Sequence, residues 1–354
     1  MLYLARIVAA TTVLALLPAM TLAQDFNHTL RFIWEEAPFP RAHASTIVEA
    51  PDGSLISAWF GGTGEGNKDV GVWSSRKPRG GDWSPPRELY KEPGQPAWNP
   101  VLFRDAADTI WLFFKIGPSP REWTGAYMKS ATSGQRWTEP VWLPAGMLGP
   151  VRAKPVTLAN GDILAGTSWE SYEAWSSWME VSTDGGESWT KHGPILFGDM
   201  EQDRKGTIQP TLIEIEPGVV RAFFRTRRMG KIATSISQDS GRNWAPMQLT
   251  DLDHPGAGID SVRLADGRCI LIYNPSVTRR TPLSLAVSFD NGITWEDFLV
   301  IEELAADQRG ELSYPAMIQD VNENLQITYT WNRQRIRHVT VPFDLIPEKP
   351  EGGR

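Results

Sequence analysis

One pattern occurs six times along this chain: a polar residue, usually followed by proline, leads into a short apolar run. The lead residues are His43, Asn99, Lys154, Gln209, Asp260 and Tyr314, which lie 56, 55, 55, 51 and 54 positions apart. A fixed period of about 50 residues with strand-like content predicts a radial array of small sheets, a β-propeller. The apolar frame repeats because every sheet packs on its neighbours, whereas the lead residue differs in each copy. We therefore expect six unlike polar groups to meet near one axis and form a binding site.

A second motif has a similar period. The pattern S-x-D-x-G-x-[S/T/N]-W occurs at residues 182–189, 237–244 and 288–295, with a degraded copy at 130–137 and a remnant at 80–83. In such a turn the aspartate accepts hydrogen bonds from backbone N–H groups, glycine adopts a positive φ and tryptophan is buried between sheets. The motif, an Asp-box, is thus a structural hairpin between outer strands, and its aspartates are not catalytic candidates.

Turn signals separate the apolar runs, and no long segment shows helical periodicity. We predict an all-β fold, a six-bladed β-propeller with Asp-box hairpins, formed as a single domain by residues 24–345. A strand near residues 26–32 is expected to complete the last blade, because closing the ring leaves no open sheet edge. Residues 346–354 are expected to form a disordered tail.

The first 23 residues differ from the rest of the chain. Arg6 is their only charged side chain, residues 7–22 are apolar or small, and Ala23 precedes Gln24. This order predicts a secretory signal peptide at residues 1–23 and hence a periplasmic or secreted protein. An uncleaved anchor is the alternative, which Pro18 and the short apolar run disfavour. No later segment approaches about 18 uninterrupted apolar residues, so we expect no membrane insertion after cleavage.

Charge and cysteine content exclude several kinds of site. The chain carries 42 acidic and 35 basic residues without basic runs, which disfavours nucleic acid or an anionic membrane as a partner. The single cysteine, Cys269, lies in an apolar run and cannot form an intramolecular disulfide. The five histidines show no paired spacing, so we expect no metal and no other cofactor. We expect a monomer.

The Asp-box hairpins and the repeated strands resemble the sialidase (neuraminidase) superfamily over residues 26–342. This resemblance implies a propeller that hydrolyses a terminal sugar whose carboxylate is clamped by arginines, which suit a planar bidentate anion. Arg225 and Arg280 are similar in place to two clamp arginines, with Arg279 as the neighbouring alternative. Tyr314 takes the place of the family's tyrosine nucleophile.

The resemblance also implies an acid/base group in the glycine-rich stretch 61–68, where Glu65 falls near the family's aspartate and Asp69 is the second candidate. Two positions depart from the family. His43 stands where the first clamp arginine is expected, and Gln209 stands where a glutamate takes the tyrosine proton. A neutral amide cannot act as that base. The chain is most similar to a divergent branch of predicted neuraminidases, through segments 43–49, 98–103 and 115–123.

The remaining candidates come from the polar lead residues and one loop. Asn99 and Gln209 are expected to hydrogen-bond substrate, and Lys154 and Asp260 to form an ion pair across the axis or to bind substrate. Arg121 lies in a proline-rich loop beside Trp123, which suits the face of a sugar.

We therefore expect an exported exo-glycosidase of the sialidase type, with a glycan or oligosaccharide as substrate. Glu65 would protonate the leaving oxygen, while Tyr314 and His43 would stabilise the cationic sugar. Two alternatives remain open. One is a polysaccharide lyase, or a glycosidase for another sugar such as a uronate or rhamnose, that uses His43 and Tyr314 for proton transfer. The other is a non-catalytic carbohydrate-binding propeller, which Gln209 and His43 favour.

Overall fold

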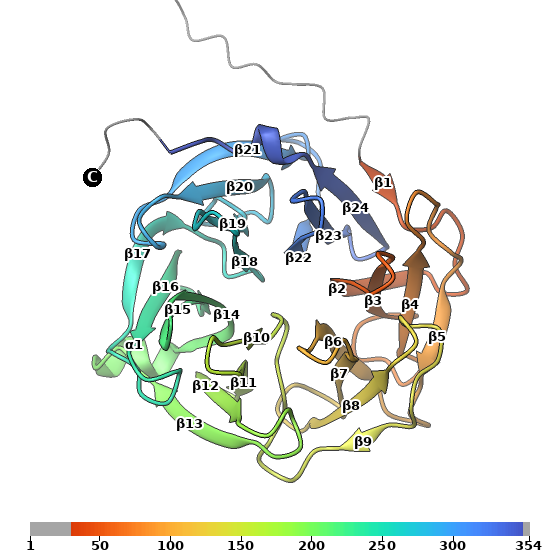
Figure 1. The fold of residues 1–354 in the computed structure, drawn as a ribbon, viewed down its shortest axis with the longest axis horizontal. Helices are drawn as coiled ribbons and strands as arrows, with labels where there is room; N and C mark the ends of the chain where they lie inside the picture. Colours follow the sequence, from red (N-terminus) through yellow and green to blue (C-terminus); the bar gives the residue numbers. More distant parts are fainter. Residues whose placement is uncertain (1–29, 350–354) are drawn as a thin grey trace, which may run out of the picture.

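The computed structural model describes residues 30–349, which form six four-stranded antiparallel sheets around a central axis (Figure 1). The first three blades are β2–β5 (Arg41–Glu49, Leu55–Gly62, Gly71–Lys77, Arg87–Tyr90), β6–β9 (Ala97–Arg104, Ile110–Ile116, Thr124–Ser130, Val141–Trp142) and β10–β13 (Val156–Thr157, Ile163–Glu170, Trp175–Ser182, Thr190–Ile195). The next two are β14–β17 (Thr207–Glu216, Val219–Thr226, Lys231–Ser237, Gln248–Asp253) and β18–β21 (Asp260–Arg263, Cys269–Tyr273, Leu283–Ser288, Glu296–Glu302). The predicted all-β, six-bladed propeller is confirmed.

The sixth blade joins the two ends of the chain. It consists of β22 (Leu312–Gln319), β23 (Leu325–Trp331), β24 (Arg335–Val341) and, at its outer edge, β1 (Arg31–Phe32), which pairs with β24. The predicted closing strand is thus confirmed for residues 31 and 32. Just after it, the Trp34 ring stacks on that of Trp59 in blade 1, with ring centroids 4.4 Å apart. The predicted signal peptide and residues 26–29 lie outside the described residues.

The Asp-box turns have the structural role predicted for them. In the blade 5 turn, Asp290 accepts hydrogen bonds from the backbone N–H of Thr294 at 2.9 Å and from its hydroxyl at 2.6 Å. Trp295, which follows, packs edge-on against Phe223 of blade 4, with ring centroids 5.3 Å apart. Each such turn therefore ties one blade to the next.

Short helices and the C-terminal segment complete the fold. Helix α1 (Met200–Lys205) connects blades 3 and 4, and a 3₁₀ turn, η2 (Phe343–Leu345), follows β24. Ile346, placed in the expected tail, is buried, and its carbonyl oxygen accepts a hydrogen bond of 2.9 Å from Arg268 Nη1. Ordered packing thus reaches Ile346. Between residues 30 and 349, no helix has the length and apolar character needed to cross a membrane.

The first strand of each blade lines the centre (Figure 1), and four of these strands are bulged near the axis. At the bulge a non-glycine residue adopts left-handed φ: Ala44 (56°), Asn99 (39°), Gln209 (57°) and Tyr314 (51°). Each residue in this conformation raises the free energy of the folded state by about 1–3 kcal/mol, so packing between the surrounding blades must enforce the conformation. In blade 1 the residue with this conformation is therefore Ala44. It lies one position after His43, the residue that the sequence pattern aligned with Asn99, Gln209 and Tyr314.

Candidate active site

Two rings of side chains surround one mouth of the propeller. The inner ring comes from the first strands. The outer ring comes from the ends of the second strands and the loops that follow them, because each second strand runs back to the same face. Every blade contributes charged residues to this outer ring, among them Glu65, Arg121, Glu170, Arg225, Arg280 and Arg333, one from each blade in turn.

Tyr314 lies where the two rings meet. Arg225 Nη1 donates hydrogen bonds to Tyr314 Oη at 2.8 Å and to Gln209 Oε1 at 3.2 Å. Gln209 Nε2 lies 3.5 Å from the same phenol oxygen. The guanidinium carbons of Arg225 and Arg280 are 5.8 and 5.9 Å from the centroid of the tyrosine ring. Four of the sequence-predicted residues, Tyr314, Arg225, Arg280 and Gln209, are thus brought together. The phenol oxygen faces cations and an amide instead of a carboxylate.

A third guanidinium, which is not among the sequence-predicted candidates, lies beside this tyrosine. Arg152 is 1% exposed, and its guanidinium carbon lies 5.3 Å from the centroid of the Tyr314 ring. It donates to the backbone oxygens of Pro315 and Ser45. Burial lowers the pKa of Arg152 to about 10, so the group stays charged at pH 7. A Cβ on Gly258 would come within 3.2 Å of Arg152 Nε, so glycine at this position leaves the space that Arg152 occupies.

His43 is a buried neutral group. Its Nδ1 is 3.0 Å from Thr330 Oγ1, its ring centroid is 4.2 Å from that of Tyr314, and it is 2% exposed. Burial and four nearby arginine side chains, Arg333 the strongest of them, lower the pKa of His43 well below its ordinary value. At pH 7 the imidazole is therefore uncharged, so it cannot bind a carboxylate as the clamp arginine expected at this position would.

Arg333, also missed from the sequence, supplies a cation close to His43. Its Nη1 forms an ion pair with Glu65, and its Nε donates to Glu311 Oε1 at 2.8 Å. Glu311 also binds Arg280 Nη1 at 3.3 Å. His43, Glu65 and Arg333 line a cavity of about 240 Å³. One signal could have found Arg333: Arg225 and Arg280 lie 55 positions apart, and Arg333 comes 53 positions later.

The same period leads backwards from Arg225 to Glu170, 55 positions earlier. Glu170 ends β11 and pairs across the strands with Trp175, whose ring lies 4.9 Å from the guanidinium carbon of Arg225. Burial raises the pKa of Glu170, opposed by the positive charge of Arg225 and supported by the negative charge of Glu65.

Three predicted residues are engaged elsewhere on this face. Asp69 accepts hydrogen bonds from the backbone and the hydroxyl of Thr63, at 2.9 and 2.8 Å, and so holds its own loop together. Arg279 Nη2 donates to the backbone oxygens of residues 305 and 308, away from its neighbour Arg280. Arg121 lies at the rim, with its guanidinium carbon 5.5 Å from the ring centroid of the exposed Tyr172. Asn99 lies in the inner ring and is buried.

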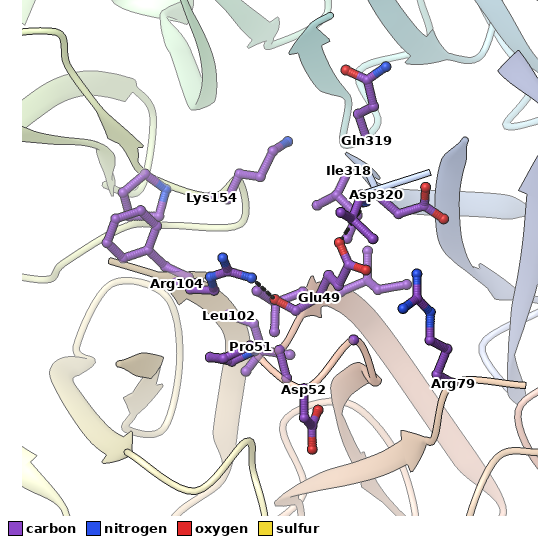
Figure 2. Close-up of a pocket in the computed structure, with 17 residues that line it drawn as sticks. Glu49, Pro51, Asp52, Arg79, Leu102, Arg104, Lys154, Ile318, Gln319 and Asp320 are labelled. Carbon is purple, nitrogen blue, oxygen red and sulfur yellow. Dashed lines mark hydrogen bonds between the residues drawn. The ribbon is translucent and has the colours of Figure 1, made fainter. Parts of the chain in front are cut away.

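Lys154 and Asp260 form the ion pair predicted across the axis, with Nζ–Oδ distances of 2.9 and 3.0 Å. Lys154 faces the opposite mouth, however, where it lines a cavity of about 740 Å³ with the turns at residues 51–53 and 318–321 (Figure 2). This cavity is larger than the one beside His43, but two of its cations already form ion pairs, Lys154 with Asp260 and Arg104 with Asp108.

We place the site at the Tyr314 mouth because buried cations and carboxyl groups converge there.

Three buried histidines, His43, His254 and His338, are expected to make stability depend on pH. Burial lowers the pKa of His254 and of His338 to about 3, so both are neutral in the folded protein at pH 7, as is His43. In the unfolded chain a histidine takes up a proton below about pH 6.5. The free energy of unfolding should therefore fall as the pH falls from 6.5 to about 5, by roughly 1.4 kcal/mol per pH unit for each histidine.

Urea denaturation across this pH range measures the slope. The variant His338→Gln keeps a hydrogen-bond partner for Gln326. It should reduce the slope by the contribution of one histidine, roughly 1.4 kcal/mol per pH unit. A free energy of unfolding that does not change over this range would contradict the prediction.

Comparisons with known proteins agree with this architecture. The BNR repeat-like domain family matches residues 53–327. A curated protein named sialidase, from Bacteroides fragilis, is 24% identical over 229 residues, which are 60% of this chain and 40% of that protein. This chain thus spans less than half the length of that relative.

Solved structures share the fold at low sequence identity. The NanB sialidase of Streptococcus pneumoniae superposes with a TM-score of 0.74 at 13% identity, covering 90% of this chain and 71% of that one. A protein of unknown function from Dyadobacter fermentans gives a TM-score of 0.70 at 20% identity, covering 88% and 97%. A Hadza microbial sialidase gives 0.71 at 19% identity, covering 87% and 66%. The chain therefore belongs to the BNR repeat-like domain family and is a divergent sialidase-like propeller.

Proposed function

We propose that this protein is an exo-acting glycosidase of the sialidase type, which hydrolyses a terminal, carboxylate-bearing sugar from a glycan. One observation carries the proposal: the guanidinium groups of Arg225 and Arg280 converge on Tyr314 at a single mouth of the propeller. Guanidinium groups bind a carboxylate through charge-assisted, often bidentate hydrogen bonds. Names of the matching sialidases point to the same class of reaction.

The side chains at this mouth can be assigned to the needs of glycoside hydrolysis. The reaction requires a proton donor to the leaving oxygen and a group that stabilises or attacks the cationic sugar. We assign Tyr314 to the sugar, because Arg225 donates to its oxygen and would stabilise negative charge there. Arg333 adds a cation beside His43, where the family clamp has an arginine. The proton comes from a carboxyl group of the outer ring, either Glu65 or Glu170.

We further propose that residues 1–23 direct export to the periplasm or the medium, where the mature chain meets its glycan as a monomer. The composition of this segment supports the proposal: one charged residue, an apolar stretch and small residues before Gln24.

A second candidate function is carbohydrate binding without turnover. Gln209 favours it, because this amide lies 3.5 Å from the Tyr314 oxygen and cannot accept the phenol proton as a carboxylate would. The arginine constellation would then hold an acidic sugar at the end of a glycan and leave it intact.

A substrate panel separates the two functions. The mature chain is incubated with sialosides and uronosides that share one aglycone, with a neutral rhamnoside as the control, and products are followed by mass spectrometry. Release of an acidic sugar supports hydrolysis, and an unsaturated uronate would indicate elimination instead. Binding of an acidic glycan in calorimetry without any product supports the binding function. Selective release of the neutral sugar would contradict the carboxylate clamp.

A further inference from the structure

Two carboxyl groups of the outer ring differ in what surrounds them. Glu65, in the loop after β3, is 35% exposed and is bound by Arg333, which also contacts Glu311. To give a proton to a substrate, this carboxyl group would first have to leave its ion pair. Its position instead suits the ordering of Arg333 beside the cavity that holds His43.

Glu170 has the opposite surroundings. Its side chain is half-buried at the end of β11, and within residues 30–349 its carboxyl group has no ion pair and no hydrogen bond. Burial raises the pKa of Glu170, although Arg225 opposes the rise. Burial that favours the protonated form of a carboxyl group is a common way in which proteins prepare a general acid.

A chain of contacts links Glu170 to Tyr314. Its backbone pairs with Trp175, the ring of Trp175 packs on the guanidinium of Arg225, and Arg225 donates to the Tyr314 oxygen at 2.8 Å. Glu170 and Glu65 come from blades 3 and 1, so they approach the mouth from different directions.

We propose that Glu170 is the catalytic proton donor to the leaving glycosidic oxygen, and that Glu65 positions Arg333. This inference rests on the proposed glycosidase function. The bond between the anomeric carbon and the leaving oxygen breaks as that oxygen takes the carboxyl proton of Glu170. After the aglycone has left, the oxygen of a water molecule bonds to the anomeric carbon, and the water's proton passes to the Glu170 carboxylate. Glu170 ends the cycle protonated.

Glu170→Gln and Glu65→Gln, two isosteric variants, test this assignment with two substrates of the same acidic sugar. One is a nitrophenyl glycoside, whose leaving group needs no proton, and the other is a glycan with an alcohol leaving group. Glu170→Gln should lower kcat/KM on the glycan, which reports the steps up to departure of the aglycone, about 100-fold or more, because general acid catalysis contributes about 10²–10⁴-fold. On the nitrophenyl glycoside the loss of kcat/KM should stay below about 10-fold. The fall of wild-type activity on the alkaline side of its pH profile should be absent in Glu170→Gln.

Glu65→Gln is expected to act differently. It should affect both substrates equally and chiefly through KM, since it loosens Arg333. If Glu170→Gln slows both substrates equally or neither, or if Glu65→Gln shows the selective loss, the assignment is wrong while the proposed function stands. A wild-type chain that turns over no acidic glycoside overturns the proposed function and this inference together. Thermal melting of both variants verifies that they are folded.

Discussion

Replacing Arg280 with alanine is expected to lower kcat/KM for a carboxylate-bearing glycoside by about 100-fold or more. The guanidinium carbon of Arg280 lies 5.9 Å from the centroid of the Tyr314 ring, and Nη1 binds Glu311 at 3.3 Å. Removing one member of a desolvated, hydrogen-bonded charge pair costs about 2–5 kcal/mol, and every 1.36 kcal/mol corresponds to tenfold in rate. Initial rates at substrate concentrations below KM measure the effect.

The neighbouring residue offers a matched control. Arg279 carries the same side chain one position earlier, but it donates to backbone oxygens at residues 305 and 308. Arg279→Ala should therefore leave kcat/KM within about twofold of the wild-type value, as substitutions away from a charged contact usually do. Equal losses in the two variants, or no loss in Arg280→Ala, would remove the carboxylate clamp from the proposed function.

The second large effect is on stability. Asp260 is 1% exposed and accepts hydrogen bonds from Lys154 Nζ, from Thr211 Oγ1 at 2.9 Å and from the backbone N–H of Met317 at 2.8 Å. These partners belong to blades 3, 4 and 6, so one carboxylate joins four blades at the axis. Asp260→Ala removes the carboxylate that binds a partly exposed ammonium and two buried donors. We expect the free energy of unfolding to fall by about 3–5 kcal/mol.

Urea denaturation at pH 7 measures this change, with an exposed ion pair as the control. Glu35, whose side chain is 81% exposed, binds Arg335 at 3.0 Å. Glu35→Ala should lower the free energy of unfolding by less than about 1 kcal/mol, as is usual for surface pairs. A similarly small loss in Asp260→Ala would show that the axial ion pair does not hold the blades together.

The architecture of the propeller could be predicted from local signals. The period shared by the polar lead residues and the Asp-box tryptophans specified six blades, because each blade uses the same turns and the same buried rings. The closing strand followed from the need to pair open sheet edges, and residues 31 and 32 confirm it. These signals depend on backbone chemistry and on apolar spacing, which a sequence shows directly.

The inner ring could be predicted only in part. A bulge adds one residue to the strand and turns the following side chains, so Ala44 instead of His43 takes the position of Tyr314 in blade 1. Lys154 and Asp260 pair as expected, yet Lys154 faces the opposite mouth. The sequence contains no marker for these bulges other than the prolines that follow three of them.

By itself, the sequence determined the blades, their number and the hairpin turns, and the family resemblance singled out Arg225, Arg280 and Tyr314. The tertiary structure alone decided which charges surround that tyrosine. Arg152, Arg333 and Glu170 come from loops and strand ends outside the six lead positions, and closure of the ring brings them to one mouth. Charge interactions depend on distance and burial, and in a ring of six blades both are set by packing between segments far apart in the chain.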